Sequence, residues 1–312
     1  MQPLAFEEIA TGLQFPEGPI AMPDGSILLV EIARGTLSRV TPAGRIHVVA
    51  KLGGGPNGAA PGPGGKIYVA NNGGFTWVRL ADGRLFPSTQ PDDYSGGRIQ
   101  VVDPESGHFE TLYDACDGRG LRGPNDLVFD GAGGFWFTDL GKTRAREQDR
   151  GAVYYARADG SRIEEKIFPL ERPNGIGLSP DGHRLYVAET TTARLWAFDL
   201  AAPGEIRSAN GPYRSEKGRV LAGLGGYQFF DSLAVDAAGH ICVATLVTGC
   251  ITDIAPDGAA ITQHALPDPM VTNVCFGGAD LRTAYATLSM SGRLVRAAWP
   301  RPGLALAHSA SA

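Results

Sequence analysis

Short apolar runs separated by turn signals recur along the whole chain. Six copies of one phrase stand out, each with an apolar strand, a tight turn at a pair such as Asp-Gly or Gly-Gly, and a second apolar strand. Two clear copies read PEGPIAMPDGSILLVE and PNGIGLSPDGHRLYVAE. The Asp-Gly and Gly-Gly pairs supply the positive φ angles that a tight hairpin requires. Each copy therefore predicts a β-hairpin, and the repetition predicts an architecture of equivalent units.

A second hairpin follows the first, as in RGTLSRVTPAGRIHVVA after the first copy. Two hairpins make a four-stranded antiparallel sheet, and six such sheets predict an all-β, six-bladed β-propeller. A β-sandwich is the competing fold, but six equivalent copies suit a ring better than two stacked sheets. The residues that open the copies are 40, 68, 49, 57 and 42 positions apart. The two long gaps predict insertions near residues 73–95 and 201–226.

The ring must close, because an open ring leaves unpaired strand edges. The last copy is followed by one further strand, SGRLVRAAWP, whereas residues 4–13 precede the first copy and alternate like a strand. We therefore expect this N-terminal strand to complete the last blade. Residues 1–300 would then form a single propeller domain, and we expect residues 301–312 to be a disordered C-terminal tail.

One side-chain position of the repeat is expected to come together from all six copies. In a propeller the first strand of each blade lines the central channel, so the residue that opens this strand lies at one mouth of the channel. At all six positions, the side-chain atoms that can bind a metal ion are oxygens. They are Glu17, Asn57, Asn125, Asn174, Asp231 and Asn273.

Carboxylate and amide oxygens that converge on one point favour a hard cation. Ca²⁺ accepts such mixed oxygen ligands, whereas Zn²⁺ prefers His or Cys, and neither occurs at the six positions. The alternative is that these side chains only cap strands by hydrogen bonding to the backbone, as Asn and Asp do in turns. For the whole set a cation is favoured, because Glu17 and Asp231 would otherwise repel each other. Protonation of one carboxylate would also relieve that repulsion.

Composition and charge narrow the range of partners. The formal net charge of −5 and the pI near 5.7 argue against a nucleic-acid partner, which requires a basic surface. The N-terminal sequence does not read as a signal peptide, and no apolar run is long enough to span a bilayer. The four cysteines show no CxxC spacing and are expected to be buried, reduced thiols. We expect a cytoplasmic protein without a membrane partner, as a monomer or weak homodimer.

Four motifs carry a resemblance to a known family. They are FPEGP with Glu17, GPNDLVFD with Asn125, RPNGIGLSPDG with Asn174, and DSLAVDAAGH with Asp231. With the repeat, they make residues 6–298 resemble the SMP-30, gluconolactonase and regucalcin family, which includes luciferin-regenerating enzymes. The resemblance implies a six-bladed propeller that holds one divalent cation in its channel, usually Ca²⁺. It also implies the hydrolysis of lactones.

Matched motif by motif, the resemblance makes Glu17, Asn174 and Asp231 direct ligands of the cation. Asn125 is then a fourth ligand or binds through water, and Asp231 also serves as the catalytic base. Zn²⁺, Mn²⁺ or Mg²⁺ would be substitutes for Ca²⁺. The related diisopropyl fluorophosphatases hold a second Ca²⁺ with a His near the sixth copy. This chain reads TNVCF there, so we expect one metal only.

The substrate side departs from the family pattern at one position. The animal members place an Arg two residues before the Asn of the third copy, where it helps to bind the sugar. This chain has Gly123 there and Arg122 beside it, which weakens the expectation of an aldonolactone. The residues expected to bind substrate are Asn57, Asn72, Arg122, Asn125, Asp139, Glu189, Tyr227 and Phe229. Other residues expected at the rim are Glu31, Asn71, Lys142, Thr245, Phe75, Trp77 and Tyr94. For the aromatic residues, packing of loop against loop is the alternative.

The function predicted from these features is hydrolysis of a small sugar-derived or related lactone to the hydroxy acid. The cation would stabilise the charge that develops on the carbonyl oxygen, and Asp231 would take the proton from the attacking water. One alternative is hydrolysis of aryl esters or phosphotriesters at the same site. Another is a non-catalytic propeller that binds calcium or a small molecule, since the fold alone does not decide function.

Overall fold

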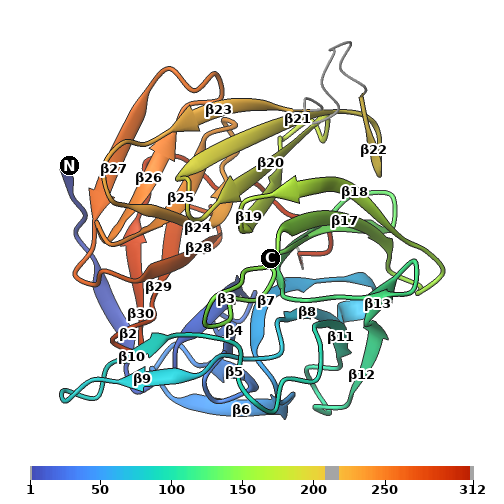
Figure 1. Cartoon of the computed structure of the whole chain (residues 1–312). Coiled ribbons are helices and arrows are strands. Elements are labelled where there is room, and N and C mark those ends of the chain that lie inside the picture. The colour runs from blue at the N-terminus through green and yellow to red at the C-terminus, as the bar shows by residue number, and fades with distance from the viewer. Residues whose placement is uncertain (1, 208–217, 310–312) are drawn as a thin grey trace.

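The computed structural model of the chain describes residues 2–207 and 218–309. Its main sheets are arranged as six blades around a central axis (Figure 1). The inner strand of each blade contacts the inner strands of the two neighbouring blades, and the last blade contacts the first. The prediction of an all-β, six-bladed propeller is confirmed.

Each blade has four antiparallel strands that follow one another from the channel outward. Blade 1 contains β3 (Pro16–Ala21), β4 (Ile27–Glu31), β5 (Thr36–Val40) and β6 (Ile46–Lys51). Blade 2 contains β7 (Pro56–Pro61), β8 (Ile67–Asn71), β11 (Arg98–Val102) and β12 (Phe109–Tyr113). Blade 3 contains β15 (Pro124–Phe129), β16 (Gly134–Asp139), β17 (Gly151–Arg157) and β18 (Ile163–Leu170).

The second half of the ring repeats this order. Blade 4 contains β19 (Pro173–Leu178), β20 (Arg184–Glu189), β21 (Arg194–Ala202) and β23 (Arg219–Gly223). Blade 5 contains β24 (Phe229–Val235), β25 (Ile241–Leu246), β26 (Cys250–Ile254) and β27 (Ile261–Ala265). Blade 6 contains β28 (Val271–Gly277), β29 (Thr283–Leu288) and β30 (Arg293–Ala298), and its outer strand is β2 (Glu7–Ala10).

The N-terminal segment closes the ring as predicted. Strand β2 pairs antiparallel with β30, with Glu8 opposite Val295. A further strand, β1 (Gln2–Pro3), pairs in parallel with β27 of blade 5 and was not predicted, because two residues carry no alternating pattern. The N-terminal segment therefore joins the outer edges of blades 5 and 6.

Each interface between neighbouring blades has a hydrophobic core of its own. In β16, Phe135 and Phe137 belong to the cluster shared with blade 2, and Trp136 belongs to the cluster shared with blade 4. This is the alternation expected of a strand with a blade on each side. The other four interfaces are filled in the same way. Six separate cores thus hold the inner strands in place around the channel.

The first predicted insertion forms a hairpin, β9 (Trp77–Arg79) and β10 (Leu85–Pro87). The Leu85 N–H donates at 3.2 Å to the carbonyl of Met290, in the loop between β29 and β30 of blade 6. The Gln90 N–H donates at 2.8 Å to the carbonyl of Thr143, in the loop between β16 and β17 of blade 3. The insertion therefore reaches from blade 6 to blade 3 over one face of the ring. The second insertion contains β22 (Glu205–Ile206), and residues 208–217 of it lie outside the described residues.

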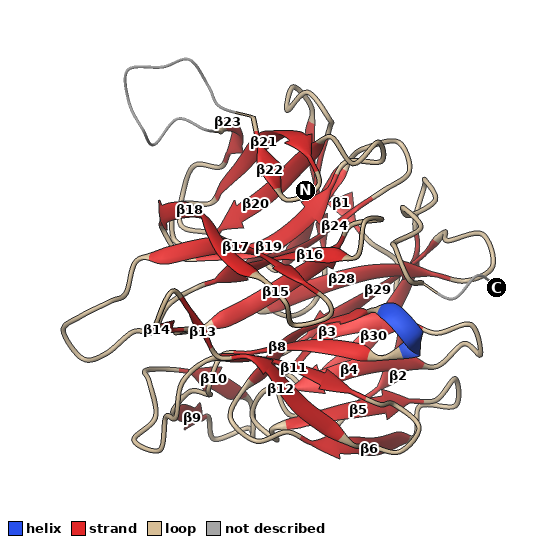
Figure 2. Ribbon diagram, turned by 90° about the vertical axis from the view of Figure 1, so that its right-hand side faces the viewer, coloured by secondary structure: helices blue, strands red, loops and turns tan. Residues whose placement is uncertain are grey.

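The described part of the expected tail, residues 301–309, lies against the propeller. Arg301 forms ion pairs with Asp236 and Asp253. The Leu304 N–H donates to the carbonyl of Val235 at the end of β24, and the His308 ring lies 5.2 Å from that of Phe129 at the end of β15. This segment therefore crosses the far end of the ring, on the face opposite the β9–β10 hairpin (Figure 2). The expectation for residues 310–312 lies outside the described residues.

Helices contribute almost nothing to the described ranges. The 3₁₀ turn η1 (Pro63–Gly65) follows β7, and no helix in residues 2–207 and 218–309 is long and apolar enough to cross a membrane. The four cysteines are free thiols, and three of them are buried.

Candidate metal centre

A β-bulge interrupts every inner strand near its start. The register against the second strand shifts between Glu17 and Ile20 in β3 and between Pro173 and Ile176 in β19, and the other four inner strands shift at the same place. A bulge bends the strand and redirects the side chains beside it. The bulges coincide with the six residues predicted to meet at the channel mouth. All six are buried, with exposed fractions from 2% for Glu17 to 7% for Asp231.

Hydrogen bonds between blades show that these residues converge. Asn273 Nδ2 donates to Glu17 Oε2 at 2.9 Å, which joins blade 6 to blade 1. Asn57 Nδ2 lies 3.5 Å from the carbonyl oxygen of Asn125, which joins blade 2 to blade 3. Ser232 Oγ, next to Asp231, lies 3.4 Å from Asn174 Oδ1 and joins blade 5 to blade 4.

No ion pair among the described residues neutralises the carboxylates at the mouth. None of the ion pairs in the described ranges involves Glu17, Asp126 or Asp231. Burial raises the pKa of Glu17 well above its usual range, and the charge of Asp126 raises it further. Burial and then the charge of Glu17 raise the pKa of Asp231. The two predicted carboxylates therefore interact with each other in the folded protein.

Asp126 is a third buried carboxylate that the sequence reasoning missed. Burial raises the pKa of Asp126 to about 7, against hydrogen bonds from the Leu127 N–H and from Ser232 that lower it. The signal was present in the sequence, because Asp126 directly follows Asn125 in GPNDLVFD.

The metal-free protein is expected to lose stability as the pH rises. The pKa of Asp126 is higher in the folded protein than its ordinary value of 3.8. The stability that this shift contributes is therefore complete below pH 3.8 and is lost as the pH rises through about 7. From Asp126 alone the free energy of unfolding should fall by about 2 kcal/mol between roughly pH 5 and pH 7. Urea unfolding in the presence of a chelator measures this. Asp126→Asn should make this fall smaller, and a wild-type profile that stays flat or rises would contradict the assignment.

The donor set fits a hard cation. Asn125 Oδ1 is buried and has no hydrogen-bond partner among the described residues, which is unfavourable unless another group satisfies it. Asn174 Nδ2 donates to Thr190 Oγ1 at 3.1 Å, so its Oδ1 is turned away from Thr190. In the described ranges no three His, Cys, Asp or Glu side chains are placed to hold a metal. A cation here would need amide oxygens as well as carboxylates, which suits Ca²⁺ or Mg²⁺ better than Zn²⁺.

Asn57 and Asn72, both expected to bind substrate, lie in one hydrogen-bond network. Asn72 Nδ2 donates to Asn57 Oδ1 at 2.8 Å. Lys142 Nζ donates to the carbonyl of Asn72 at 3.0 Å and to that of Gly74, and it lies 4.5 Å from the centre of the Phe75 ring. The network therefore fixes the start of the first insertion beside the channel mouth.

Asp139 and Glu189 hold the loops that lead into the inner strands. Asp139 accepts hydrogen bonds from the N–H groups of Arg122 and Gly123, at 2.8 and 2.6 Å. Glu189 accepts one from the N–H of Glu171 at 2.8 Å. Each loop ends at an Asn of the channel mouth, so both carboxylates position candidate ligands. Their role in substrate binding stays a prediction, and these backbone contacts do not favour it.

The remaining residues expected to bind substrate lie at the outer rim. The Arg122 side chain is exposed. Phe229 packs on a cluster that contains Phe15 and Leu85, and Tyr227, 76% exposed, lies 5.0 Å from the Phe229 ring. Loop therefore packs against loop around Phe229, and substrate contacts by these three residues stay predictions.

Arg172 is a second residue that the sequence reasoning missed. It stands two positions before Asn174, where the equivalent residues before Glu17 and Asn125 are Phe15 and Gly123. Its φ angle is 56°, in the left-handed region that is unfavourable for residues other than Gly. Burial lowers the pKa of Arg172 and the charge of Asp231 raises it. A guanidinium group thus lies within electrostatic range of the candidate base.

Comparison with known proteins identifies the family of the chain. A family model described as "SMP-30/Gluconolactonase/LRE-like region" matches residues 15–290. The chain belongs to the SMP-30/gluconolactonase/LRE-like family. The four motifs from which the resemblance was drawn all lie within the matched range.

Proteins that resemble the chain include named lactonases. The chain is 28% identical over 295 residues to a gluconolactonase of Zymomonas mobilis, covering 87% of this chain and 75% of that protein. It is 32% identical over 213 residues to a 6-deoxy-6-sulfogluconolactonase of Pseudomonas putida, covering 67% and 69%. The crystal structure of a calcium-binding regucalcin from Agrobacterium tumefaciens superposes with a TM-score of 0.74 at 20% identity, covering 98% of this chain and 99% of that one. That likeness supports the fold alone.

Gly175 lets blades 4 and 5 approach each other at the centre. A Cβ atom there would lie 2.5 Å from the Leu233 nitrogen and 2.8 Å from the Asp231 carbonyl oxygen. Gly175→Ala should therefore lower the free energy of unfolding by about 1–3 kcal/mol, measured by urea unfolding. Gly131→Ala is the matched control, since a Cβ there meets nothing within 4 Å, and it should be neutral or slightly stabilising. Equal stability of the two variants would show that the blades do not meet as described.

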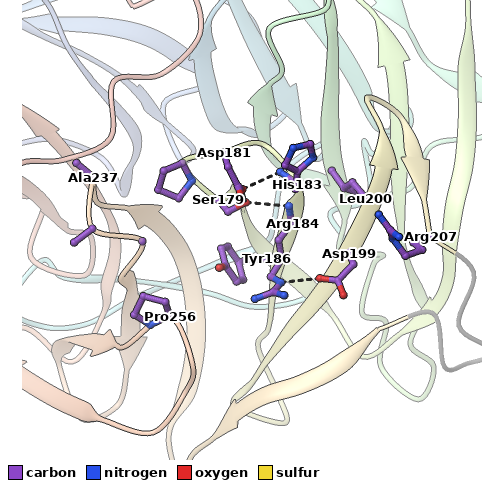
Figure 3. A pocket seen from close by; sticks show the side chains of 13 residues that line it. Ser179, Asp181, His183, Arg184, Tyr186, Asp199, Leu200, Arg207, Ala237 and Pro256 are labelled. Carbon is purple, nitrogen blue, oxygen red and sulfur yellow. Dashed lines mark hydrogen bonds and ion pairs between the residues drawn. The ribbon is translucent and has the colours of Figure 1, made fainter.

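The protein also has a cavity that is separate from the channel mouth. It has a volume of about 600 Å³, and the turn after β19 and the turn after β24 line it. Ser179, Asp181, His183 and Arg184 contribute from the first turn, and Ala237 from the second (Figure 3). Asn174 is the second residue of β19, whereas Ser179 follows the end of that strand. The cavity therefore lies at the opposite end of the inner strand from the candidate metal centre.

Proposed function

We propose that this member of the SMP-30/gluconolactonase/LRE-like family is a divalent-cation-dependent lactonase. Its substrate would be a small sugar-derived or related lactone, and its product the hydroxy acid. The observation that carries the proposal is the pair of buried carboxylates, Glu17 and Asp231, beside the unsatisfied Oδ1 of Asn125. Such a set calls for a cation. We propose Ca²⁺, held by Glu17, Asn174 and Asp231, with Asn125 as a further ligand.

The related lactonases support the class of reaction but do not select the substrate. One is named for gluconolactone and another for 6-deoxy-6-sulfogluconolactone. Because those names differ in the sugar, the chain's own residues at the mouth must decide which lactone is bound.

Asp231 is suited to move the proton. The chemistry that a bound divalent cation supplies at such a site is polarisation of the lactone carbonyl. Opposite charge close to a carboxyl lowers its pKa, so Asp231 in the loaded site is ionised at neutral pH and accepts the proton of the attacking water. Protonated Asp231 then returns that proton to the ring oxygen as it leaves.

Glu17 is less suited to this role. Its Oε2 already accepts hydrogen bonds from Asn273 Nδ2, at 2.9 Å, and from the Gly18 N–H, at 3.0 Å. An oxygen occupied in this way is fixed in position, which favours a ligand over a base.

Residues 301–309 cross the far end of the ring, so we propose that substrate enters from the face where the inner strands begin.

The proposed function is tested by following acid release on a panel of substrates. The panel contains five- and six-membered sugar lactones, an aliphatic lactone, an aryl ester and a phosphotriester. Hydrolysis of at least one lactone should be abolished by a chelator and restored by Ca²⁺. Turnover of only the aryl ester or phosphotriester would replace the proposed activity with that of a different hydrolase. Calcium binding without any turnover would indicate a non-catalytic propeller.

A further inference from the structure

The guanidinium group of Arg172 has an unused edge. Its Nη1 donates to Thr143 Oγ1 in the loop between β16 and β17 of blade 3. Its Nε is buried and has no partner, and neither Nε nor Nη2 forms a hydrogen bond within residues 2–207 and 218–309. A buried donor without an acceptor is unfavourable by about 1–3 kcal/mol. The Nε and Nη2 donors lie side by side in one plane, which is the geometry that binds both oxygens of a carboxylate.

A second cation, Lys142, directly precedes Thr143, the residue that Arg172 contacts. The Lys142 side chain is 2% exposed and donates to two backbone carbonyls. Burial lowers the pKa of Lys142 to about 8, the charges of Asp139 and Asp149 raise it, and the charge of Arg172 lowers it. Neither Lys142 nor Arg172 forms an ion pair among the described residues. The buried Lys142 ammonium group lies against the blade 2 insertion, and the partly buried Arg172 lies between blades 3 and 4, without a carboxylate in an ion pair with either.

The backbone holds Arg172 in this position. The Thr190 N–H donates to the Arg172 carbonyl at 3.0 Å. The left-handed φ of 56° at Arg172 is matched by 57° at Phe15, the equivalent residue before Glu17, so this conformation belongs to the repeat. The side chain is thus directed toward the boundary of blades 3 and 4, within range of Asp231.

We propose that the Nε and Nη2 edge of Arg172 binds a carboxylate group on the substrate, so that the preferred lactone is acidic. The inference rests on the proposed function, because it places the lactone carbonyl at the Glu17 and Asp231 centre and the carboxylate toward blades 3 and 4. Lactones of this class carry a carboxylate outside the ring, as those derived from uronic or aldaric acids do. Lys142 adds positive charge and does not contact the substrate.

A different role for Arg172 would be to offset the charge of Asp231 alone. In that role it would affect neutral and acidic lactones to the same extent. The unused donor pair favours recognition, because charge compensation needs no particular orientation of the guanidinium group, whereas binding both oxygens of a carboxylate does.

The test uses two lactams that mimic the lactone ring and resist hydrolysis. One carries a carboxylate, and the other carries the primary amide at the same position. Calorimetric titration of the Ca²⁺-loaded full chain should show about 10- to 100-fold tighter binding of the acid. Arg172→Gln should reduce acid binding to the level of the amide and leave amide binding within about twofold. Arg172→Lys should restore only part of the difference, because it keeps the charge and loses the paired donors.

Arg150→Gln is the matched control. Arg150 is also near blade 4, but it is exposed and pairs with Glu171 at 2.7 Å, so this variant should bind both lactams as wild type does. Equal binding of the two lactams by wild type would overturn the inference, as would equal weakening of both by Arg172→Gln. If Arg172→Gln does not fold, the affinities of the wild-type protein for the two lactams still decide whether the substrate carboxylate is recognised.

Turnover separates this inference from the proposed function. Discrimination between the lactams without hydrolysis of any lactone would uphold acid recognition and refute the lactonase. Hydrolysis of lactones without discrimination would uphold the lactonase and refute acid recognition.

Discussion

Asp231→Asn is expected to lower kcat for lactone hydrolysis by about 10³-fold, because it removes the proposed proton acceptor. Asparagine has nearly the same shape and keeps an oxygen toward the site. The substitution also removes one of two interacting buried carboxylates. In the metal-free state at about pH 8, the variant should therefore be at least as stable as wild type. Activity is expected to be lost while stability is retained, because the Asp231 carboxylate serves the reaction but destabilises the metal-free fold.

The measurement is initial rate at saturating substrate and Ca²⁺, together with urea unfolding in chelator. Asp257→Asn is the control, since Asp257 is on an exposed turn of the same blade, and its kcat should match wild type. A kcat for Asp231→Asn within about fivefold of wild type would remove Asp231 from the mechanism. A large loss of metal-free stability would give it a structural role instead.

Glu17→Gln is expected to weaken Ca²⁺ binding by at least about 100-fold. Affinity for Ca²⁺ follows the number of charged ligands, and Glu17 is one of two predicted carboxylate ligands. The amide is nearly isosteric, but it also places a second NH₂ group against Asn273 Nδ2, which now donates to Glu17 Oε2 at 2.9 Å. Calorimetric titration with Ca²⁺ measures the affinity, and the rise in melting temperature on adding Ca²⁺ should disappear.

Glu8→Gln provides the comparison for that result. Glu8 is an exposed glutamate on β2, in a neighbouring blade, and it pairs with Arg293 at 3.6 Å. Its substitution should leave Ca²⁺ affinity unchanged. If Glu17→Gln and Glu8→Gln bind Ca²⁺ equally well, the cation is not held at the channel mouth.

The ring and its central residues were predictable because the chain repeats itself. Every copy carries the same hairpin signals, so the inner strands and the residues that open them could be assigned before the structure. Closure by β2 also followed, since residues 4–13 alternate and the last blade lacked a strand. Strand β1 and the bulges could not be predicted, because Gln2–Pro3 is too short for a pattern and a bulge depends on the partner strand.

The surroundings of the centre were less predictable, because they depend on contacts between blades. Asp126 and Arg172 are each within two residues of a predicted ligand, yet only packing shows that one is buried and that the other approaches Asp231. Asp139 and Glu189 were assigned to the rim from their position after a strand. The structure shows that their carboxylates accept backbone N–H groups of the loops before the inner strands, which sequence spacing cannot indicate.

Anomalous scattering from crystals grown with Ca²⁺ tests the central claim most directly. The account predicts one strong calcium peak at the channel mouth, about 2.3–2.6 Å from carboxylate oxygens of both Glu17 and Asp231. A map without a peak there, or with the calcium bound elsewhere, from protein that hydrolyses lactones would contradict it.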